Sequence, residues 1–312
     1  MFLVTGGAGF IGSHLVDCLL KMGAGRIVVI DNLSTGNVDN ISKDSRVEVL
    51  NERAENSKPE GKFDFILHLA SMADPTAFIE HPIEIMDANI LGTRNMLELA
   101  EKTGAKFLFA STSEVYGNPP AEALPLKEEY NGNVSVLGPR ACYDESKRVG
   151  EVLVRAFIQN RKVDGRIVRI FNTYGPKMKR YGQYGRVVPN FVCQALVGEP
   201  LTVYGTGKQT RSFCYVTDTV AGMLLLLFRE GTKGMIVNVG NDNEMSVLEL
   251  ANIVTELTGT ESNIVFKELP KDDPLRRKPD LTKAKTLGYS PKVKLEDGLR
   301  ETIKFYKGIL GK

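Results

Sequence analysis

The chain has 312 residues, of which 42% are hydrophobic and 25% charged, and its formal net charge is +2. These values are typical of a globular protein with a sizeable core, and they argue against nucleic acid as the partner. The longest apolar run, Ala221–Phe228, is too short to cross a bilayer, which argues against a membrane protein. The four cysteines are scattered and form no cluster with the three histidines, so we expect reduced thiols and no metal site.

The first twelve residues, MFLVTGGAGFIG, predict a strand, a glycine-rich turn and the start of a helix. Phe2–Val4 is apolar, Gly6, Gly9 and Gly12 follow at intervals of three, and Ile11–Leu20 has a helical pattern. A helix that begins directly after a strand leaves its first N–H groups unpaired, and glycines let a pyrophosphate approach them. The glycines alone also fit a flexible turn. Because the first strand begins at residue 2, we expect no signal peptide and a cytoplasmic protein.

An acidic residue follows at the distance that a dinucleotide site requires. Arg26–Ile30 is the second predicted strand, and Asp31 ends it nineteen residues after Gly12. A carboxylate there can accept both hydroxyls of an adenosine ribose but would repel a 2′-phosphate. Asp31 could also be only a turn residue before Asn32. Since no arginine follows directly, the pattern predicts NAD as the cofactor and not NADP.

Apolar runs then alternate with helical patterns, which predicts an α/β fold: a Rossmann-type doubly wound parallel sheet with helices on both faces. Further strands are expected at Arg46–Leu50, Phe63–His68, Lys106–Ala110 and Arg166–Ile170, and long helices near Ile83–Thr103 and Ala141–Gln159. A loop-rich passage with Gly182 and Gly185 follows Asn172.

Shorter helices and strands follow this passage and predict a smaller C-terminal α/β lobe. The expected elements are Val187–Val197, Leu201–Tyr204, Asp218–Phe228 and Met235–Val239, then two helical patterns within Ser246–Gly311. This lobe should cover the crevice at the carboxyl ends of the strands. We therefore predict a NAD-binding domain at residues 1–172, to which residues 215–240 return, and a second lobe at residues 173–312 that covers the ligand crevice.

Two polar stretches carry residues suited to proton transfer. The strand Lys106–Ala110 leads into Ser111–Gly117, where Thr112 would face the crevice, although the same residues could form only a capping turn. Tyr143 and Lys147 are four residues apart and share one face of a helix. A nearby ammonium lowers the pKa of a phenol and favours a phenolate that acts as a base. A solvated Tyr–Lys pair is the alternative for that spacing alone.

Together, TGGAGFIG, the strand end with Thr112 and the Tyr143-x-x-x-Lys147 pair resemble the extended short-chain dehydrogenase/reductase family of NAD-dependent nucleotide-sugar epimerases, dehydratases and decarboxylases. The resemblance covers essentially the whole chain. It implies that Thr112 polarises the O4 hydroxyl of a sugar, Tyr143 takes its proton, and Lys147 holds the nicotinamide ribose and tunes Tyr143. It also implies a homodimer formed through the two long helices. The implied cofactor contacts are Gly6, Gly9, Phe10, Ile11, Gly12, Asp31, Asn32, Leu69, Ala70, Asn89, Tyr143 and Lys147.

Within the family, the stretch Ser111–Gly117 is similar to the UDP-glucuronate decarboxylases, as are Gly138–Arg148, Arg169–Pro176 and Gly198–Gly205. Dehydratases carry Asp-Glu where this chain has Ser113-Glu114. The resemblance implies decarboxylation of UDP-glucuronate to UDP-xylose through a 4-keto intermediate, with Glu114 as a catalytic residue. The implied contacts to the UDP-sugar are Ser113, Asn172, Arg186, Val188, Leu201, Val203, Tyr204, Arg211 and Arg277.

One stretch departs from that pattern. The decarboxylases usually carry a proline-rich segment ending in Tyr after His-Leu-Ala, whereas this chain has Met72, Asp74 and Phe78. An additional carboxylate beside a uronic acid is electrostatically unfavourable. A 2-acetamido UDP-uronate decarboxylase and a UDP-hexose 4-epimerase therefore stay open. A non-catalytic NAD-binding regulator is a further alternative, although the presence of Tyr143 and Lys147 argues against it.

Overall fold

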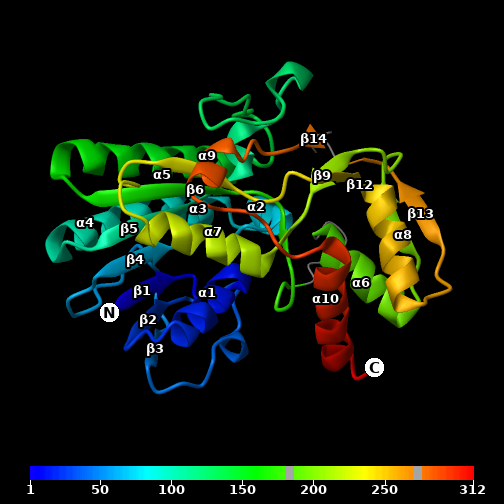
Figure 1. Cartoon of the computed structure of the whole chain (residues 1–312), viewed down its shortest axis with the longest axis horizontal. Coiled ribbons are helices and arrows are strands. Elements are labelled where there is room, and N and C mark those ends of the chain that lie inside the picture. The colour runs from blue at the N-terminus through cyan, green and yellow to red at the C-terminus, as the bar shows by residue number, and fades with distance from the viewer. Residues whose placement is uncertain (180–185, 270–275) are drawn as a thin grey trace.

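The computed structural model describes residues 1–179, 186–269 and 276–312, and Figure 1 shows them as two lobes. Within these residues, the larger lobe is built on a seven-stranded sheet of order β11-β6-β5-β4-β1-β2-β3. All neighbouring strands pair in parallel. The strands are β1 (Phe2–Thr5), β2 (Ile27–Ile30), β3 (Val47–Leu50), β4 (Phe65–His68), β5 (Lys106–Thr112), β6 (Asp164–Ile170) and β11 (Ile236–Val239). The predicted Rossmann-type doubly wound sheet is confirmed.

Helices cover both faces of this sheet. One face is packed by α1 (Phe10–Lys21) and α7 (Val216–Phe228), and the other by α4 (Thr93–Thr103) and α5 (Ala141–Arg161). Successive side chains of β1 point to opposite faces of the sheet. Val4 packs with α1 and α7, whereas Leu3 packs with α4 and α5. Strands buried on both sides explain the continuous apolar runs in the sequence.

The predicted helix over residues 83–103 is interrupted by a wider turn. The chain forms α2 (Pro75–Glu80), α3 (Pro82–Asp87), a π-helical segment (Ala88–Gly92) and then α4. Thr93 Oγ1, at the start of α4, donates to the carbonyl oxygen of Asn89 in this segment at 2.6 Å. Single π-helical turns inside α-helices often occur near functional sites.

The strand β5 is two residues longer than predicted. It pairs with β6 as far as Thr112, which lies opposite Ile170. Ser111 and Thr112 are therefore the last residues of a central strand, at the carboxyl edge of the sheet where ligands bind in this class of fold.

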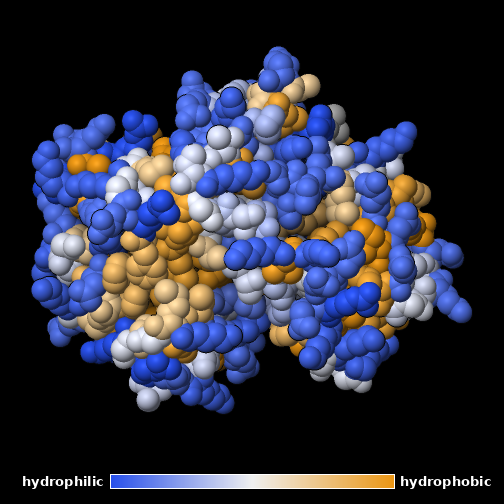
Figure 2. All heavy atoms as spheres, in the orientation of Figure 1, coloured by the Kyte–Doolittle hydropathy of each residue, from blue (hydrophilic) through white to orange (hydrophobic). Residues whose placement is uncertain are grey.

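The smaller lobe has its own apolar core, which includes Phe191, Leu201, Val203, Leu250 and Leu299. The pairs β9–β12, β9–β14 and β8–β13 form its small sheets. Its elements are α6 (Val187–Val197), β8 (Leu201–Tyr204), β9 (Thr210–Ser212), β12 (Glu244–Ser246), α8 (Val247–Thr258), β13 (Ile264–Lys267), β14 (Arg276–Arg277) and α10 (Leu295–Leu310). Figure 2 shows apolar side chains over α7 and beside α8, with a notch between the lobes at the lower edge.

The chain crosses between the lobes several times. At the junction β7 (Thr173–Tyr174) pairs with β10 (Cys214–Tyr215), after which α7 and β11 return to the large lobe. The short helix α9 (Thr282–Thr286) also returns, and Tyr289 lies in the large-lobe core, which the sequence did not predict. The domain boundary at residue 172 stays a prediction. The predicted loop residues Gly182 and Gly185 lie outside the described residues.

Among the residues that the structure describes, no helix is both long enough and apolar enough to span a membrane.

Candidate active site

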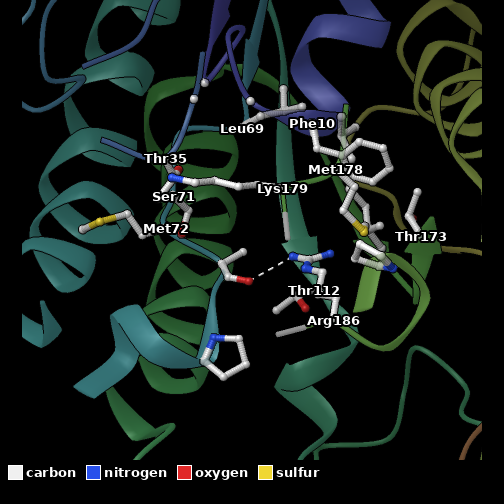
Figure 3. Close-up of a pocket in the computed structure, with 18 of the residues that line it drawn as sticks. Phe10, Thr35, Leu69, Ser71, Met72, Thr112, Thr173, Met178, Lys179 and Arg186 are labelled. Atoms are coloured by element: carbon white, nitrogen blue, oxygen red, sulfur yellow. Dashed lines mark hydrogen bonds between the residues drawn. The ribbon is translucent and has the colours of Figure 1, made fainter. Parts of the chain in front are cut away.

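A cleft of about 1290 Å³ extends from the carboxyl edge of the large sheet to the small lobe. Figure 3 shows Phe10 and Leu69 at one end and Thr112 and Arg186 farther along, while Lys179 extends toward Thr35 and Ser71. Single-ligand pockets are commonly about 300–1,000 Å³ in volume, so this cleft has room for a dinucleotide and a second ligand.

The glycines at the start of α1 form a cradle that side chains would fill. A Cβ on Gly12 would lie 2.1 Å from the carbonyl oxygen of Gly6, and one on Gly6 would lie 2.8 Å from the amide nitrogen of Ala70. Gly6 also has a φ of +72°, which favours glycine. Gly9 is the N-cap and offers no side chain to the first N–H groups of α1, and Phe10, Ile11 and Gly12 of this first turn line the cleft. This geometry fits the pyrophosphate of a dinucleotide.

Asp31 lies where the ribose of such a dinucleotide would bind. Its carboxylate accepts hydrogen bonds from the N–H of Ala8 at 2.9 Å and of Leu33 at 2.8 Å. Burial raises the pKa of Asp31, and these backbone hydrogen bonds oppose that rise. Asp31 and Asn32 both line the cleft. The residues present therefore fit NAD.

The end of β4 closes the opposite side of this cradle. The N–H groups of Leu69 and Ala70 donate to Thr5 Oγ1 at 3.2 and 3.1 Å, and His68 Nδ1 lies 2.7 Å from the same oxygen. Leu69 and Ala70 line the cleft as predicted from the sequence. The carboxyl ends of β1 and β4 are thereby tied together beside the glycine turn.

Tyr143, Thr112 and Lys147 converge on the cleft. Burial raises the pKa of Tyr143 to about 12, and its hydrogen bond with Thr112 is the largest opposing influence. Lys147 Nζ donates to the carbonyl oxygen of Ala110 at 2.9 Å and lies 5.9 Å from the centre of the Tyr143 ring. The sequence analysis expected the ammonium of Lys147 to lower the pKa of Tyr143. In this structure burial is the dominant influence, and the pKa of Tyr143 is raised.

Glu114 forms an ionic cluster at the end of the cleft that the small lobe covers. Its carboxylate accepts from Arg140 and from both terminal nitrogens of Arg277, one of them at 3.0 Å. Burial alone would raise the pKa of Glu114, but the two guanidinium groups outweigh it and hold the pKa well below its ordinary range. Glu114 is consequently ionised at physiological pH.

Most of the predicted substrate contacts meet at this end of the cleft. Arg277 and Arg211 are register partners on β14 and β9, and both are buried. Arg186 Nη2 donates to the carbonyl oxygen of Ala73 at 2.9 Å. The predicted substrate contacts that line the cleft are Ser113, Asn172, Arg186, Val188, Tyr204, Arg211 and Arg277.

Three predicted contacts do not line the cleft. Leu201 and Val203 point into the core of the small lobe, because alternate residues of β8 face opposite sides. Asn89 is fully buried and donates to Ser146 Oγ at 2.8 Å, so its position does not support contact with the cofactor. Thr202, which lines the cleft, was missed, although strand alternation with Tyr204 could have identified it.

The stretch that departs from the decarboxylase pattern is divided between the cleft and helix α2. Met72 and Phe78 line the cleft, and the Phe78 ring stacks on Tyr143 with 4.8 Å between ring centres. Asp74 is buried as the N-cap of α2 and accepts from the N–H of Thr76 at 2.8 Å. Its carboxylate therefore serves the helix, and it is not among the cleft-lining residues.

Curated relatives of high similarity cover almost the whole chain. UDP-glucuronic acid decarboxylase 1 of Xenopus tropicalis is 46% identical over 309 residues, which are 98% of this chain and 72% of the relative. UDP-glucuronic acid decarboxylase 6 of Arabidopsis thaliana is 47% identical over 302 residues, with 95% and 86% covered.

Solved structures of similar fold bind nucleotide sugars. A UDP-glucose 4-epimerase of Thermotoga maritima, solved with UDP-glucose, has a TM-score of 0.89 and 31% identity, with 99% of both chains covered. A UDP-glucuronic acid 4-epimerase of Bacillus cereus, in complex with UDP-glucuronic acid and NAD, has a TM-score of 0.87 and 30% identity, again with 99% covered. Residues 2–240 match the NAD dependent epimerase/dehydratase family. The chain therefore belongs to the NAD-dependent epimerase/dehydratase family.

Proposed function

We propose that this protein decarboxylates UDP-glucuronate to UDP-xylose through a 4-keto intermediate, with NAD as the cofactor. The observation that carries the proposal is the set of arginines that line the cleft around Glu114 and Tyr143: Arg140, Arg186, Arg211 and Arg277. A diphosphate and a uronate carboxylate are anions that arginine binds through two parallel hydrogen bonds. The curated relatives, which are named UDP-glucuronic acid decarboxylases, support the same substrate.

When bound, NAD⁺ supplies an acceptor for the C4 hydride of the sugar and later returns that hydride. Tyr143 takes the O4 proton, assisted by the Thr112 hydroxyl, as C4 becomes a ketone. The substrate is then a β-keto acid: the C5–C6 bond breaks, CO₂ leaves, and the bonding electrons enter the C4 carbonyl. Hydrogen bonds from Thr112 and the protonated Tyr143 hold the resulting enolate until C5 gains a proton.

Glu114 positions the substrate in this scheme and does not donate a proton. Its carboxylate is ionised and held by Arg140 and Arg277. A dehydratase needs an acid for the leaving hydroxyl, which an ionised Glu114 cannot supply. We assign Arg211 to the uronate carboxylate, Glu114 to positioning the carbon that bears this carboxylate, and Arg277 with Asn172 to the diphosphate.

Exposed apolar side chains on α3, on the π-helical segment Ala88–Gly92 and on α5 suit a homodimer formed through the two long helical stretches. Val152 is 66% exposed on α5, and Ile83 is 65% exposed on α3. Further exposed apolar residues on the same helical run and on α5 are Met86, Leu91 and Val149. Exposed apolar side chains on neighbouring helices support an interface at this face.

The test compares three substrates under identical conditions with NAD⁺: UDP-glucuronate, a 2-acetamido UDP-uronate and UDP-glucose. We expect CO₂ and a UDP-pentose, identified by mass, from UDP-glucuronate. Preferential decarboxylation of the 2-acetamido UDP-uronate would show that this sugar, and not UDP-glucuronate, is the substrate. Conversion of UDP-glucose to UDP-galactose without CO₂ would instead identify a 4-epimerase.

A further inference from the structure

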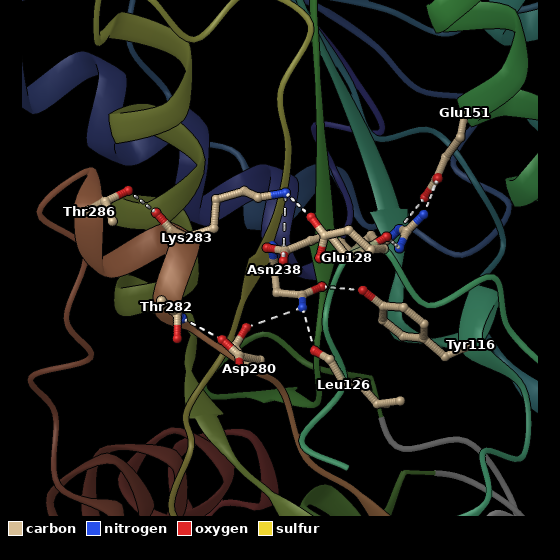
Figure 4. Close-up of polar contacts among 11 residues, drawn as sticks. Tyr116, Leu126, Glu128, Glu151, Asn238, Asp280, Thr282, Lys283 and Thr286 are labelled. Carbon is tan, nitrogen blue, oxygen red and sulfur yellow. Dashed lines mark hydrogen bonds and ion pairs between the residues drawn. The ribbon is translucent and has the colours of Figure 1, made fainter. Parts of the chain in front are cut away.

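A buried polar network lies between α5 and the strands β5 and β6 (Figure 4). Glu151 accepts from Ser111 Oγ at 2.6 Å and from Arg169 Nε and Nη2 at 2.9 and 2.7 Å. Arg169 also donates to the carbonyl oxygen of Glu128 at 2.9 Å, and its guanidinium lies 4.8 Å from the centre of the Tyr116 ring. Three donors on two strands thus fix the Glu151 carboxylate.

Lys147 is buried one helical turn before Glu151. Its Nζ donates to the carbonyl oxygen of Ala110 and lies 5.0 Å from the centre of the Phe109 ring. Burial lowers the pKa of Lys147 to about 7, and the negative charge of Glu151 opposes this decrease. Because this pKa lies near neutrality, a small change in the surrounding charge changes the protonated fraction of Lys147.

Glu151 also holds the strand end that carries the catalytic threonine. Ser111, which donates to Glu151, directly precedes Thr112. The helix approaches the strand this closely because Gly150 has no side chain: a Cβ there would lie 2.4 Å from Phe109 Cζ. A change at Glu151 therefore reaches both the lysine and the threonine of the site.

We propose that Glu151 is a positioning residue that keeps Lys147 charged and holds the strand end before Thr112, with Arg169 fixing its carboxylate. The inference rests on the proposed function and takes for Lys147 the role that the family resemblance implies, in which its ammonium holds the nicotinamide ribose. Glu151 is not among the cleft-lining residues and acts only through its neighbours.

The other titratable groups around Lys147 do not replace Glu151. Burial lowers the pKa of His68 on β4 to about 3, so this ring is neutral at physiological pH. Tyr143, with its pKa raised to about 12, carries no charge before it gives up its proton. Arg169 on β6 is paired with Glu151 through two hydrogen bonds and is not among the charges that act on Lys147.

The variant Glu151→Gln removes the charge and keeps an acceptor for Ser111. NMR titration of ¹³C-labelled lysine side chains, with Lys147→Arg assigning the signal, should show the pKa of Lys147 falling by about one pH unit or more. With UDP-glucuronate, kcat should fall about fivefold or more at neutral pH and recover toward lower pH. Glu151→Asp, which keeps the charge, should give an intermediate pKa and serves as the second variant if Glu151→Gln does not fold.

Glu128→Gln is the matched control. Glu128 is buried in the same network and accepts from the N–H of Asn238 at 2.8 Å, but it is not among the charges acting on Lys147. The variant Glu128→Gln should leave both the titration of Lys147 and the pH profile of kcat unchanged. An unaltered pKa of Lys147 in Glu151→Gln and Glu151→Asp would overturn the inference. Failure of the wild type to decarboxylate UDP-glucuronate would overturn the proposed function, while the NMR titration would still decide the role of Glu151.

Discussion

Tyr143 has the surroundings of a base that is used only during turnover. Its ring stacks on Phe78, and it is buried, which raises the pKa of its hydroxyl to about 12. The hydrogen bond with Thr112 acts in the opposite direction. In the protein by itself the phenol therefore keeps its proton, and groups bound in the cleft must favour the phenolate for the reaction to start.

Replacing Tyr143 with Phe removes this hydroxyl and leaves the ring stack in place. We expect kcat to fall by about 10²–10⁴-fold, the usual contribution of a positioned base. NAD binding, measured by calorimetry, should change little because the glycine cradle and Asp31 are untouched. Tyr130→Phe, a change at a ring that stacks on Tyr116, is the control. Turnover at the wild-type rate in Tyr143→Phe would exclude Tyr143 as the base.

The environment of Asp144 leads us to expect a pH-dependent difference in stability between the wild type and Asp144→Asn. Burial, followed by the negative charge of Glu114, raises the pKa of Asp144 to about 7, and Oδ1 has no hydrogen-bond partner. The folded protein thus holds this proton more tightly than the unfolded chain, and the resulting stability is lost as pH rises through 7. Asp144→Asn cannot lose a proton, so it should gain roughly 1 kcal/mol over the wild type between pH 6 and 8.

Thermal unfolding of the wild type and Asp144→Asn at several pH values measures this difference. Asp39→Asn, at an exposed carboxylate, should show no such trend. Parallel pH curves for the wild type and Asp144→Asn would show that Asp144 is ionised throughout.

Side-chain roles at this scale were only partly predictable from the sequence. The glycines, Thr112 and Tyr143 stand in local patterns whose spacing fixes their geometry. Asp74 does not, because the same residue type serves as a helix N-cap and as a ligand group, and here it caps α2. The pairing of Glu114 with Arg277 joins residues 163 positions apart, which no local pattern reveals.

The positions of the helices and strands were predicted better than the directions in which their side chains point. Apolar periodicity located the central strands and the long helices to within a few residues. The π segment at Ala88–Gly92 was missed because a single wider turn leaves the helical pattern almost unchanged. In β8 the predicted strand was right, but Leu201 and Val203 were assigned to the cleft instead of the core.

Two substitutions on β8 distinguish the roles of its core face and its cleft face. Leu201→Ala should lower the free energy of unfolding by about 2–5 kcal/mol, because it opens a cavity in the small-lobe core, and should leave KM for the UDP-sugar nearly unchanged. Tyr204→Ala, on the cleft face, should raise KM with a smaller loss of stability. Chemical denaturation and steady-state kinetics measure both effects. A higher KM from Leu201→Ala with unaltered stability would contradict the observed facing.

At the scale of the molecule, the side chains proposed to bind the substrate come from both lobes. Arg277 on β14 reaches Glu114 beside the large sheet, and β14 pairs with β9, which carries Arg211. The sequence predicted a second lobe over the crevice. The strands β9 and β14 have only three and two residues, which is too short for a periodic pattern, so their pairing could not be predicted. The return of Leu281 and Tyr289 to the large-lobe core was likewise not predictable, because it depends on packing between distant segments.

The proposed dimer predicts a clear effect of charge on α5. Val152→Asp places a carboxylate on the 66% exposed Val152, so folding should be unaffected while an apolar helical interface is disrupted. Sedimentation velocity should show a dimer for the wild type and a monomer for Val152→Asp. Val265→Asp on β13, outside this surface, should stay dimeric. A wild type that sediments as a monomer would refute the dimer.

The most direct test of the central claim uses UDP-glucuronate that carries deuterium at C4, with the products analysed by mass spectrometry and NMR. The claim is that C4 gives up and regains its own hydride while C6 leaves as CO₂. We predict UDP-xylose, lighter than the substrate by one CO₂, with the deuterium retained at C4. A UDP-sugar of unchanged mass with an inverted C4 hydroxyl, or UDP-xylose without deuterium, would contradict it.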